Sequence, residues 1–337
     1  MILVTGGTGL VGSHLLYDLT RSGESVRATK RANSDLGNVK KVFSYYTQDP
    51  IELLNRIQWI DTDLLDIYSV LEAMQGITYV YHCAAMVSFE SKDQLEMMRS
   101  NTEGTANMVN AALEKKVARF CHVSSIASLG RAEKGALTSE EHFWKSSPDN
   151  SNYAISKYGA EREVWRASEE GLNVIIVNPS LIIGPGNWEK SSSNMFRKAY
   201  KGISFYTNGV NGFVDVRDVS SLMIRLMQSE LSNQRFIINA ENASFRHYFD
   251  LIHSGFSKRK PSIKAGPFLS GFAWRMEKLR SFFTGAPPMI TRETSRSAHR
   301  INRFSNRKIL EAFPGYEFIS LEKSVGDTCK LFLGDIR

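Results

Sequence analysis

The sequence predicts an α/β protein built on a doubly wound parallel sheet of about seven strands, with a smaller C-terminal lobe. Three observations predict it. A glycine-rich turn follows the first apolar run, β-rich and helical segments alternate to about residue 240, and the pattern is looser beyond that point. The 337 residues are 42% hydrophobic and 23% charged, which is ordinary for a globular chain that can bury a sizeable core.

The elements follow one another in a regular order. Short runs rich in β-branched and aromatic residues predict strands, and segments with helical periodicity between them predict helices. The expected strands lie at 2–6, 25–30, 57–64, 78–85, 119–125, 172–186 and 235–241. The clearest expected helices lie at 13–23, 67–76 and 102–116.

The first turn carries the strongest local signal. Between the first strand and the first helix stands "TGGTGLVG", in which glycines allow a tight turn and let backbone N–H groups approach a pyrophosphate at a helix N-terminus. The sequence therefore predicts a Rossmann-type dinucleotide site made by Gly6, Gly7, Thr8, Gly9, Leu10, Val11 and Gly12. We expect a nucleotide-binding domain over 1–180 plus 208–240, and a substrate-binding lobe over 181–207 plus 241–337.

The end of the second strand bears on the choice of nucleotide. Dinucleotide sites that prefer NAD place an acid about 20 residues after the glycines, where it binds the ribose 2′-OH. Here Lys30 and Arg31 occupy that place, and the first acid is Asp35. Cations there suit a 2′-phosphate, so NADP is the favoured cofactor. NAD remains open if Asp35 folds back onto the ribose.

A pair four residues apart suggests the chemistry. Tyr153 and Lys157, in "NYAISKYGAE", share one face of a predicted helix, where an ammonium would lower the pKa of the phenol. Ser124 and Ser125 end a strand, at the sheet edge where such folds bind ligands. These side chains suit a proton donor and an orienting hydroxyl for hydride transfer to a carbonyl.

Motifs in a fixed order complete the picture. They are "TGGTGLVG", "TDLLD", "HCAA", "NTEGT", "VSS", "YAISK", "NPSLIIGPG" and "FVDVRDV". With them the chain resembles the extended short-chain dehydrogenases/reductases of the NAD-dependent epimerase/dehydratase family. The stretch "YHCAAMVSFESKD" is most similar to dihydroflavonol 4-reductase-like enzymes. The resemblance covers residues 1 to about 240.

The resemblance implies a role for each matching residue. Tyr153 would be the proton donor, Lys157 its modulator and a ribose ligand, and Ser125 the orienting hydroxyl, chosen over Ser124 by its distance to Gly130. Asn101 matches an asparagine that steadies the active site. Further implied cofactor contacts are Asp63 and Leu64 at the adenine, Cys83, Ala84 and Ala85 beneath the cofactor, and Asn178, Pro179 and Ser180 at the nicotinamide.

Simpler interpretations stay open for three of these positions. Asp63 and Asn101 each precede a predicted helix and could only cap it. Arg217 could reach a substrate phosphate, or it could form a structural pair with Asp215 or Asp218.

Three functions are compatible with these motifs. The first is an NADP(H)-dependent reductase of a ketone or aldehyde, with a small-molecule carbonyl substrate. The alternative is a nucleotide-sugar epimerase with tightly bound NAD; a dehydratase is disfavoured, because Ile126 and Ala127 stand where dehydratases carry an Asp-Glu pair. A non-catalytic cofactor-binding scaffold is the least favoured, since Ser125, Tyr153 and Lys157 are all present.

Composition narrows location and partners. No apolar run approaches the roughly 18 residues of a membrane span, and the N-terminus lacks a signal-peptide pattern. Cys83, Cys121 and Cys329 have no metal-like spacing, so we expect reduced cysteines, no metal site and a cytoplasmic location.

The positive charge is concentrated late in the chain. Residues 253–308 carry 13 lysines and arginines against Glu277 and Glu293, whereas the whole chain has a net charge of +7. This segment would suit a phosphorylated substrate or an anionic lipid, or it is simply a solvated basic face; we expect no nucleic-acid partner.

One stretch within it, 266–285, predicts a basic amphipathic helix. Its apolar residues recur at helical spacing: Phe268, Phe272, Met276, Leu279 and Phe283. Such a helix could lie on a bilayer, cover the substrate pocket or join a homodimer. Core packing is the commoner outcome, and we favour it over a peripheral membrane contact.

Overall fold

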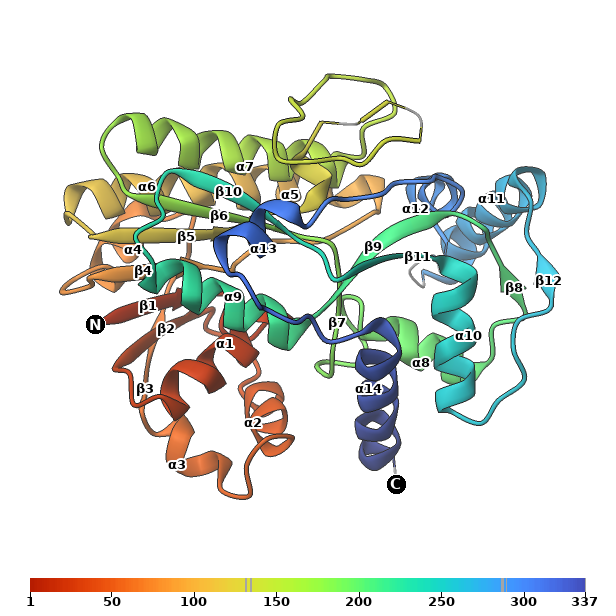
Figure 1. Ribbon diagram of the computed structural model, residues 1–337, viewed down its shortest axis with the longest axis horizontal. Coiled ribbons are helices and arrows are strands. Elements are labelled where there is room, and N and C mark those ends of the chain that lie inside the picture. Colours follow the sequence, from red (N-terminus) through yellow and green to blue (C-terminus); the bar gives the residue numbers. More distant parts are fainter. Residues whose placement is uncertain (131, 134, 286–287, 289, 337) are drawn as a thin grey trace.

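The main sheet has seven parallel strands (Figure 1). The computed structural model describes residues 1–130, 132–133, 135–285, 288 and 290–336. The strand order is β10-β6-β5-β4-β1-β2-β3. Their bounds are β1 Ile2–Thr5, β2 Val26–Lys30, β3 Ile57–Asp61, β4 Tyr79–His82, β5 Arg119–Val123, β6 Val174–Pro179 and β10 Gln234–Ile238. The predicted seven-stranded parallel sheet is confirmed.

Helices cover both faces of this sheet, which explains why its central strands are almost entirely buried. All six residues of β6 are buried. The helices are α1 Leu10–Arg21, α2 Gly37–Ser44, α3 Pro50–Leu54, α4 Ile67–Ala73, α5 Gln94–Met98, α6 Gly104–Glu114, α7 Asn152–Glu169, α8 Asn194–Lys201, α9 Val216–Gln228, α10 Phe245–Gly255, α11 Pro267–Thr284, α12 Arg292–Ser297, α13 Arg307–Ala312 and α14 Leu321–Asp335.

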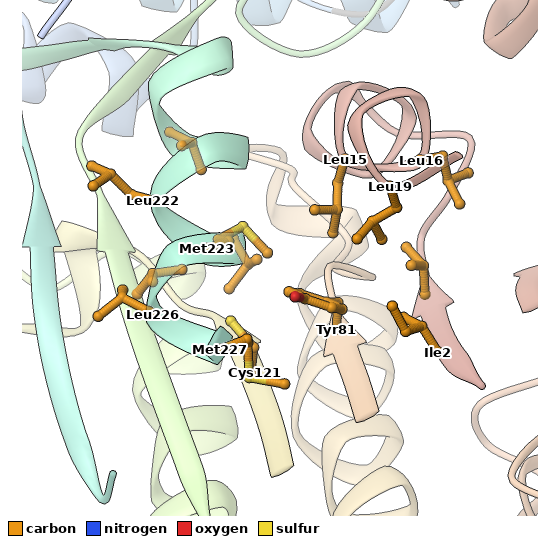
Figure 2. Packing of buried hydrophobic residues seen from close by; sticks show 14 of the residues in the cluster. Ile2, Leu15, Leu16, Leu19, Tyr81, Cys121, Leu222, Met223, Leu226 and Met227 are labelled. Atoms are coloured by element: carbon orange, nitrogen blue, oxygen red, sulfur yellow. The ribbon is translucent and has the colours of Figure 1, made fainter. Parts of the chain in front are cut away.

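Two apolar layers sandwich the sheet. On one face, leucines of α1 meet Leu222 and Met223 of α9 above Tyr81 and Cys121 of the strands (Figure 2). On the other face, α4, α6 and α7 pack Val70, Met108 and Val164 against the sheet. The three cysteines are free thiols, as the sequence predicts.

The smaller lobe has its own sheet and core. Its strands are β7 Leu181–Ile183, β9 Val210–Asp215 and β11 Glu241–Ser244, in the order β11-β9-β7. A further pair joins β8 Phe205–Tyr206 to β12 Ile263–Lys264. The lobe's core gathers large aromatic side chains, namely Trp188, Phe196, Phe213, Tyr248 and Phe332.

The chain passes between the two bodies more than once. Within the range 208–240, assigned from sequence to the nucleotide-binding domain, β9 lies in the small sheet while β10 lies in the main sheet. Residues late in the chain also return, because Ile309 of α13 is buried in the core layer of α1 and α9. The two bodies are therefore interleaved along the sequence.

The apolar stripe of α11 does not pack into the core, so that expectation is wrong. Phe268, Phe272 and Phe283 are 91%, 57% and 76% exposed. Among the described residues, no helix has the length and apolarity needed to span a bilayer.

Candidate active site

The glycine turn is packed so tightly that a side chain at Gly6 or Gly12 would clash with neighbouring backbone atoms. Gly6 adopts φ +67°, and the Gly9 N–H donates to the Gly6 carbonyl at 2.9 Å. A Cβ on Gly12 would lie 2.2 Å from the Gly6 oxygen, and one on Gly6 would lie 2.7 Å from the backbone of Ala84. The turn therefore rests on the end of β4, and the first N–H groups of α1 face outward from a cradle without side chains, which fits a bound pyrophosphate.

We expect Gly6→Ala to abolish dinucleotide binding. The new methyl would push Ala84 and the turn apart, in addition to the strain of a positive φ. Gly76→Ala is the matched control, because Gly76 has φ +70° but no atom within 4 Å of its Cβ position. Titration calorimetry should show lost binding for Gly6→Ala and unchanged binding for Gly76→Ala. Equal affinities for the two variants would contradict the cradle.

The cations at the end of β2 are placed differently from one another. Lys30 Nζ forms a 2.5 Å ion pair with Asp61 at the end of β3, whereas Arg31 is exposed. Asp35 is exposed, and its carboxylate accepts the Gly37 N–H at 2.7 Å. Asn38 of α2 reaches the loop and donates to the Thr8 carbonyl at 3.3 Å.

The residues expected at the adenine follow β3, and those expected beneath the cofactor follow β4. Asp63 does not cap α4: its carboxylate accepts the Leu65 N–H, and Asp66 is the cap. The Leu64 carbonyl accepts a hydrogen bond from Asn107 of α6. Cys83, Ala84 and Ala85 follow β4 directly, beside the glycine turn. Burial raises the pKa of the Cys83 thiol to about 12, so this cysteine is inert.

Ser125 and Tyr153 come together. Ser125 follows β5, and its hydroxyl accepts the Ala127 N–H at 3.1 Å and interacts with the Tyr153 side chain, whose pKa it lowers. Ser151 caps α7, which fixes the helix start two residues before Tyr153. The ring of Phe89 packs edge-on against Tyr153, with centroids 5.8 Å apart.

The electrostatics of Tyr153 differ from the expectation. Burial raises its pKa, and the opposing effect comes from the hydrogen bond to Ser125 and not from Lys157. The Lys157 ammonium is buried and donates to the Val123 carbonyl at 2.8 Å. Burial lowers the pKa of Lys157 to about 8, against a smaller raising effect of Glu161.

Lys157→Met should stabilise the protein at neutral pH. The folded-state pKa of about 8 lies below the ordinary 10.5, so the folded protein binds fewer protons than the unfolded chain between these values. The penalty is complete below about pH 8 and disappears as the pH rises toward 10.5. The variant should gain about 2 kcal/mol of unfolding free energy at pH 7, and less at pH 9.

Urea unfolding at both pH values measures this difference. Lys330→Met, at an exposed lysine of α14, is the control and should have a small effect at either pH. A destabilised Lys157→Met at pH 7 would contradict the buried, costly ammonium.

Asn101 joins two parts of the site. It lies in a π-helical turn, Arg99–Glu103, inside a helical stretch that begins at Gln94, so it does not cap a helix. Its side chain accepts the Met86 N–H at 2.7 Å and donates to the Met86 carbonyl at 2.9 Å and to Ser156 at 3.0 Å. Asn101 thus ties the segment after β4 to the helix of Tyr153; π turns often occur at such sites.

The comparisons with known proteins agree with this geometry. A model of the NAD dependent epimerase/dehydratase family matches residues 2–239. The chain belongs to this family. It is therefore an NAD(P)-dependent enzyme of the extended short-chain dehydrogenase/reductase type.

Individual relatives of this epimerase/dehydratase-family enzyme span most of its length. A putative dihydroflavonol 4-reductase of Synechocystis is 28% identical, covering 98% of this chain and 93% of its own. Sterol demethylase protein B of Methylococcus capsulatus is 28% identical, covering 85% and 84%. The solved structure of gox2253 superposes with a TM-score of 0.81 at 28% identity, covering 99% of this chain and 98% of its own.

The sequence alone did not identify one buried acid near the site. Glu161, one turn beyond Lys157, is 2% exposed and accepts from Ser124 and Ser128, each at 2.6 Å. It also accepts from Asn178 at 2.9 Å and pairs with Arg235 at 3.1 Å. The sequence signal that could have identified Glu161 is its spacing of four from Lys157, because positions 153, 157 and 161 share one helix face.

His82 was missed as well. It accepts at Nδ1 from Thr5 at 2.7 Å, and its Nε2 lies 3.0 Å from Thr105, which donates to the Asn101 carbonyl. Burial lowers the pKa of His82 to about 3, so the ring is neutral. Because the Thr105 hydroxyl donates to the Asn101 carbonyl, it accepts from His82, so Nε2 carries the proton. These hydrogen bonds link β1 to the π turn.

Two polar atoms of the family enzyme fit a bound dinucleotide. Asn178 and Pro179 end β6, and Ser180 follows. Nδ2 of Asn178 donates to Glu161, Ser128 and the Ser125 carbonyl. Its Oδ1 is buried without a partner among the described residues. The hydroxyl of Ser180 is likewise buried and unpaired within that part of the chain. Buried orphan acceptors and donors of this kind are satisfied by a ligand or by water.

Arg217 is a structural residue. It forms a two-pronged pair with Asp215, at 2.9 and 2.8 Å, and contacts Asp327 of α14 at 3.1 Å. A cavity of about 990 Å³ lies beside the later part of α7, and its lining includes Tyr158, Glu161 and Arg162. Neither Ser125 nor Tyr153 lines it, so we do not place the substrate there.

Proposed function

We propose that this protein is an NADP(H)-dependent reductase that transfers a hydride to the carbonyl carbon of a ketone or aldehyde. The observation that carries the proposal is the interaction of the Ser125 hydroxyl with the Tyr153 phenol, which lowers the phenol's pKa, at the carboxyl edge of the main sheet. A protonated phenol beside an orienting hydroxyl can bind a carbonyl oxygen and deliver a proton to it. Open α/β sheets bind their ligands at this edge.

Each residue then has a defined task. Tyr153 donates its proton to the substrate oxygen as negative charge develops there, and Ser125 holds that oxygen in place. Lys157 contributes positive charge beneath the phenol, fixed by the Val123 carbonyl. Asn101 acts as a positioning residue through Met86 and Ser156.

The reduced nicotinamide would supply the hydride. The residues that fit such a cofactor are Gly6, Gly7, Thr8, Gly9, Leu10, Val11 and Gly12 at the pyrophosphate, Asp63 and Leu64 at the adenine, and Cys83, Ala84, Ala85, Lys157, Asn178, Pro179 and Ser180 toward the nicotinamide.

The charge at the end of β2 supports NADP. Arg31 is exposed and would pair with a 2′-phosphate, whereas the carboxylate of Asp35 accepts the Gly37 N–H at the start of α2. Similarity to a putative dihydroflavonol 4-reductase along nearly the whole chain supports the reductase assignment.

One observation favours the alternative, a nucleotide-sugar epimerase with tightly bound NAD. The ion pair between Lys30 and Asp61 withdraws one of the two cations from a 2′-phosphate. Epimerases use the same Ser-Tyr-Lys set, so the catalytic residues do not separate the two functions.

The deciding experiment identifies the nucleotide that the purified protein retains. Mass spectrometry of the released nucleotide is followed by a panel of ketones and aldehydes, monitored by loss of reduced-nicotinamide absorbance. We expect tighter binding of NADPH than of NADH, and net turnover with NADPH. Stoichiometric retained NAD without net turnover would overturn the reductase in favour of the epimerase.

A further inference from the structure

Helix α11 presents a continuous apolar stripe to solvent. The residues at 268, 272, 276, 279 and 283 fall within an arc of about 80° at 3.6 residues per turn. All of them are exposed, and the neighbouring Leu269 and Phe282 are exposed as well. A scattered apolar residue on a surface needs no explanation, but a stripe that runs along an entire helix marks an interaction site.

The opposite side of α11 is anchored to the protein. Ser270 is buried and its hydroxyl lies 2.8 Å from Nε2 of His299, and α11 packs beside α12 (Figure 1). Glu293 of α12 accepts the backbone N–H of Asn152, one residue before Tyr153. The stripe therefore has a fixed outward orientation, and α12, against which α11 packs, contacts the start of the catalytic helix.

Cations accompany the stripe and acids do not. Arg275 and Lys278 are exposed along one edge of it, and Lys264 is exposed on β12 just before the helix. The two acids of the segment 253–308 are turned inward: Glu277 lies opposite the stripe and pairs with Arg280 at 2.8 Å, while Glu293 contacts α7.

We propose that α11 docks this protein on an anionic lipid bilayer, with the stripe inserted among the lipid chains and the flanking cations at the headgroups. An apolar face bordered by lysine and arginine is complementary to such a surface. A two-fold contact with a second copy would place the same cations against each other, and nucleic acid offers no apolar surface to five large side chains. The inference does not depend on the proposed function.

Vesicle flotation with the full-length protein tests the proposal. The vesicles are phosphatidylcholine alone, or phosphatidylcholine with about 30 mol% phosphatidylserine, at NaCl concentrations of about 0.1 and 0.5 M. We expect binding only to the anionic vesicles, weakened at high salt. Phe272→Ser/Phe283→Ser should reduce the partition coefficient at least about tenfold.

Matched variants distinguish binding through the stripe from non-specific binding by other exposed aromatic or cationic side chains. Tyr68→Ser/Phe143→Ser removes two similarly exposed aromatic side chains elsewhere, and it should bind like the unmodified protein. Arg275→Gln/Lys278→Gln should weaken binding more than Arg303→Gln/Arg307→Gln, which removes the same charge from exposed residues outside α11. Circular dichroism confirms that each variant is folded.

Three outcomes would overturn the proposal. They are no binding to anionic vesicles at low salt, equal binding by the stripe variant and its control, and a lipid-independent dimer that the stripe variant dissociates. None of these readouts involves catalysis, so failure of the reductase assignment leaves this test intact.

Discussion

Tyr153→Phe should lower kcat/KM for carbonyl reduction by roughly 10²–10⁴-fold while cofactor affinity stays unchanged. Phenylalanine keeps the ring and its packing against Phe89, but it removes the hydroxyl that donates the proton to the substrate oxygen in the proposed mechanism. Steady-state kinetics and cofactor titration on the same preparation measure the two quantities separately.

Tyr158→Phe is the matched control. Tyr158 lies on the same helix but faces away from the site, where its ring stacks on Trp144 at 4.5 Å. Its loss should leave kcat/KM within about twofold of the original value, because no reacting group touches it. Activity retained by Tyr153→Phe would show that the proton donor is misassigned; activity lost equally in both variants would point to damage of α7 in general.

Glu161→Ala should lower the free energy of unfolding by about 3–5 kcal/mol. The carboxylate is the shared acceptor for Ser124, Ser128 and Asn178, and it neutralises Arg235. Without it, a largely buried guanidinium loses its charged partner, and three polar groups lose one of their hydrogen bonds. Chemical denaturation at neutral pH gives the number directly.

The comparison variant is Glu163→Ala. Glu163 lies two residues away on α7 and forms an ion pair with Arg166 at 3.0 Å at the surface. A surface pair of this kind contributes about 0–1 kcal/mol, so this variant should be nearly neutral. If Glu161→Ala were equally mild, the buried network would not be a major source of stability.

The sequence predicted the main sheet well because its signals are local. Continuous apolar runs bounded by turns specify buried parallel strands, and the turn "TGGTGLVG" has few alternative conformations. The position of Ser125 followed from a general rule, since open α/β sheets bind their ligands at the carboxyl ends of the strands.

Other features depend on partners that are distant in the chain. The charge of Lys30 is neutralised by Asp61, which lies 31 residues later. The buried charge of Glu161 is neutralised by Arg235, 74 residues later. Single-residue patterns do not encode such pairings. The same is true of α11. Its apolar periodicity correctly predicts a helix, but whether that apolar face is buried depends on packing partners elsewhere in the chain.

The interleaved path of the chain limits how this architecture can be recombined. Segments 181–215 and 241–306 build the small lobe together with α14, but α9 and β10 complete the larger body, and Ile309 closes its core. A single crossover between two homologous genes would therefore split one of the hydrophobic cores. New specificity in this fold is more accessible through loop exchange and point substitution than through a swap of one contiguous module.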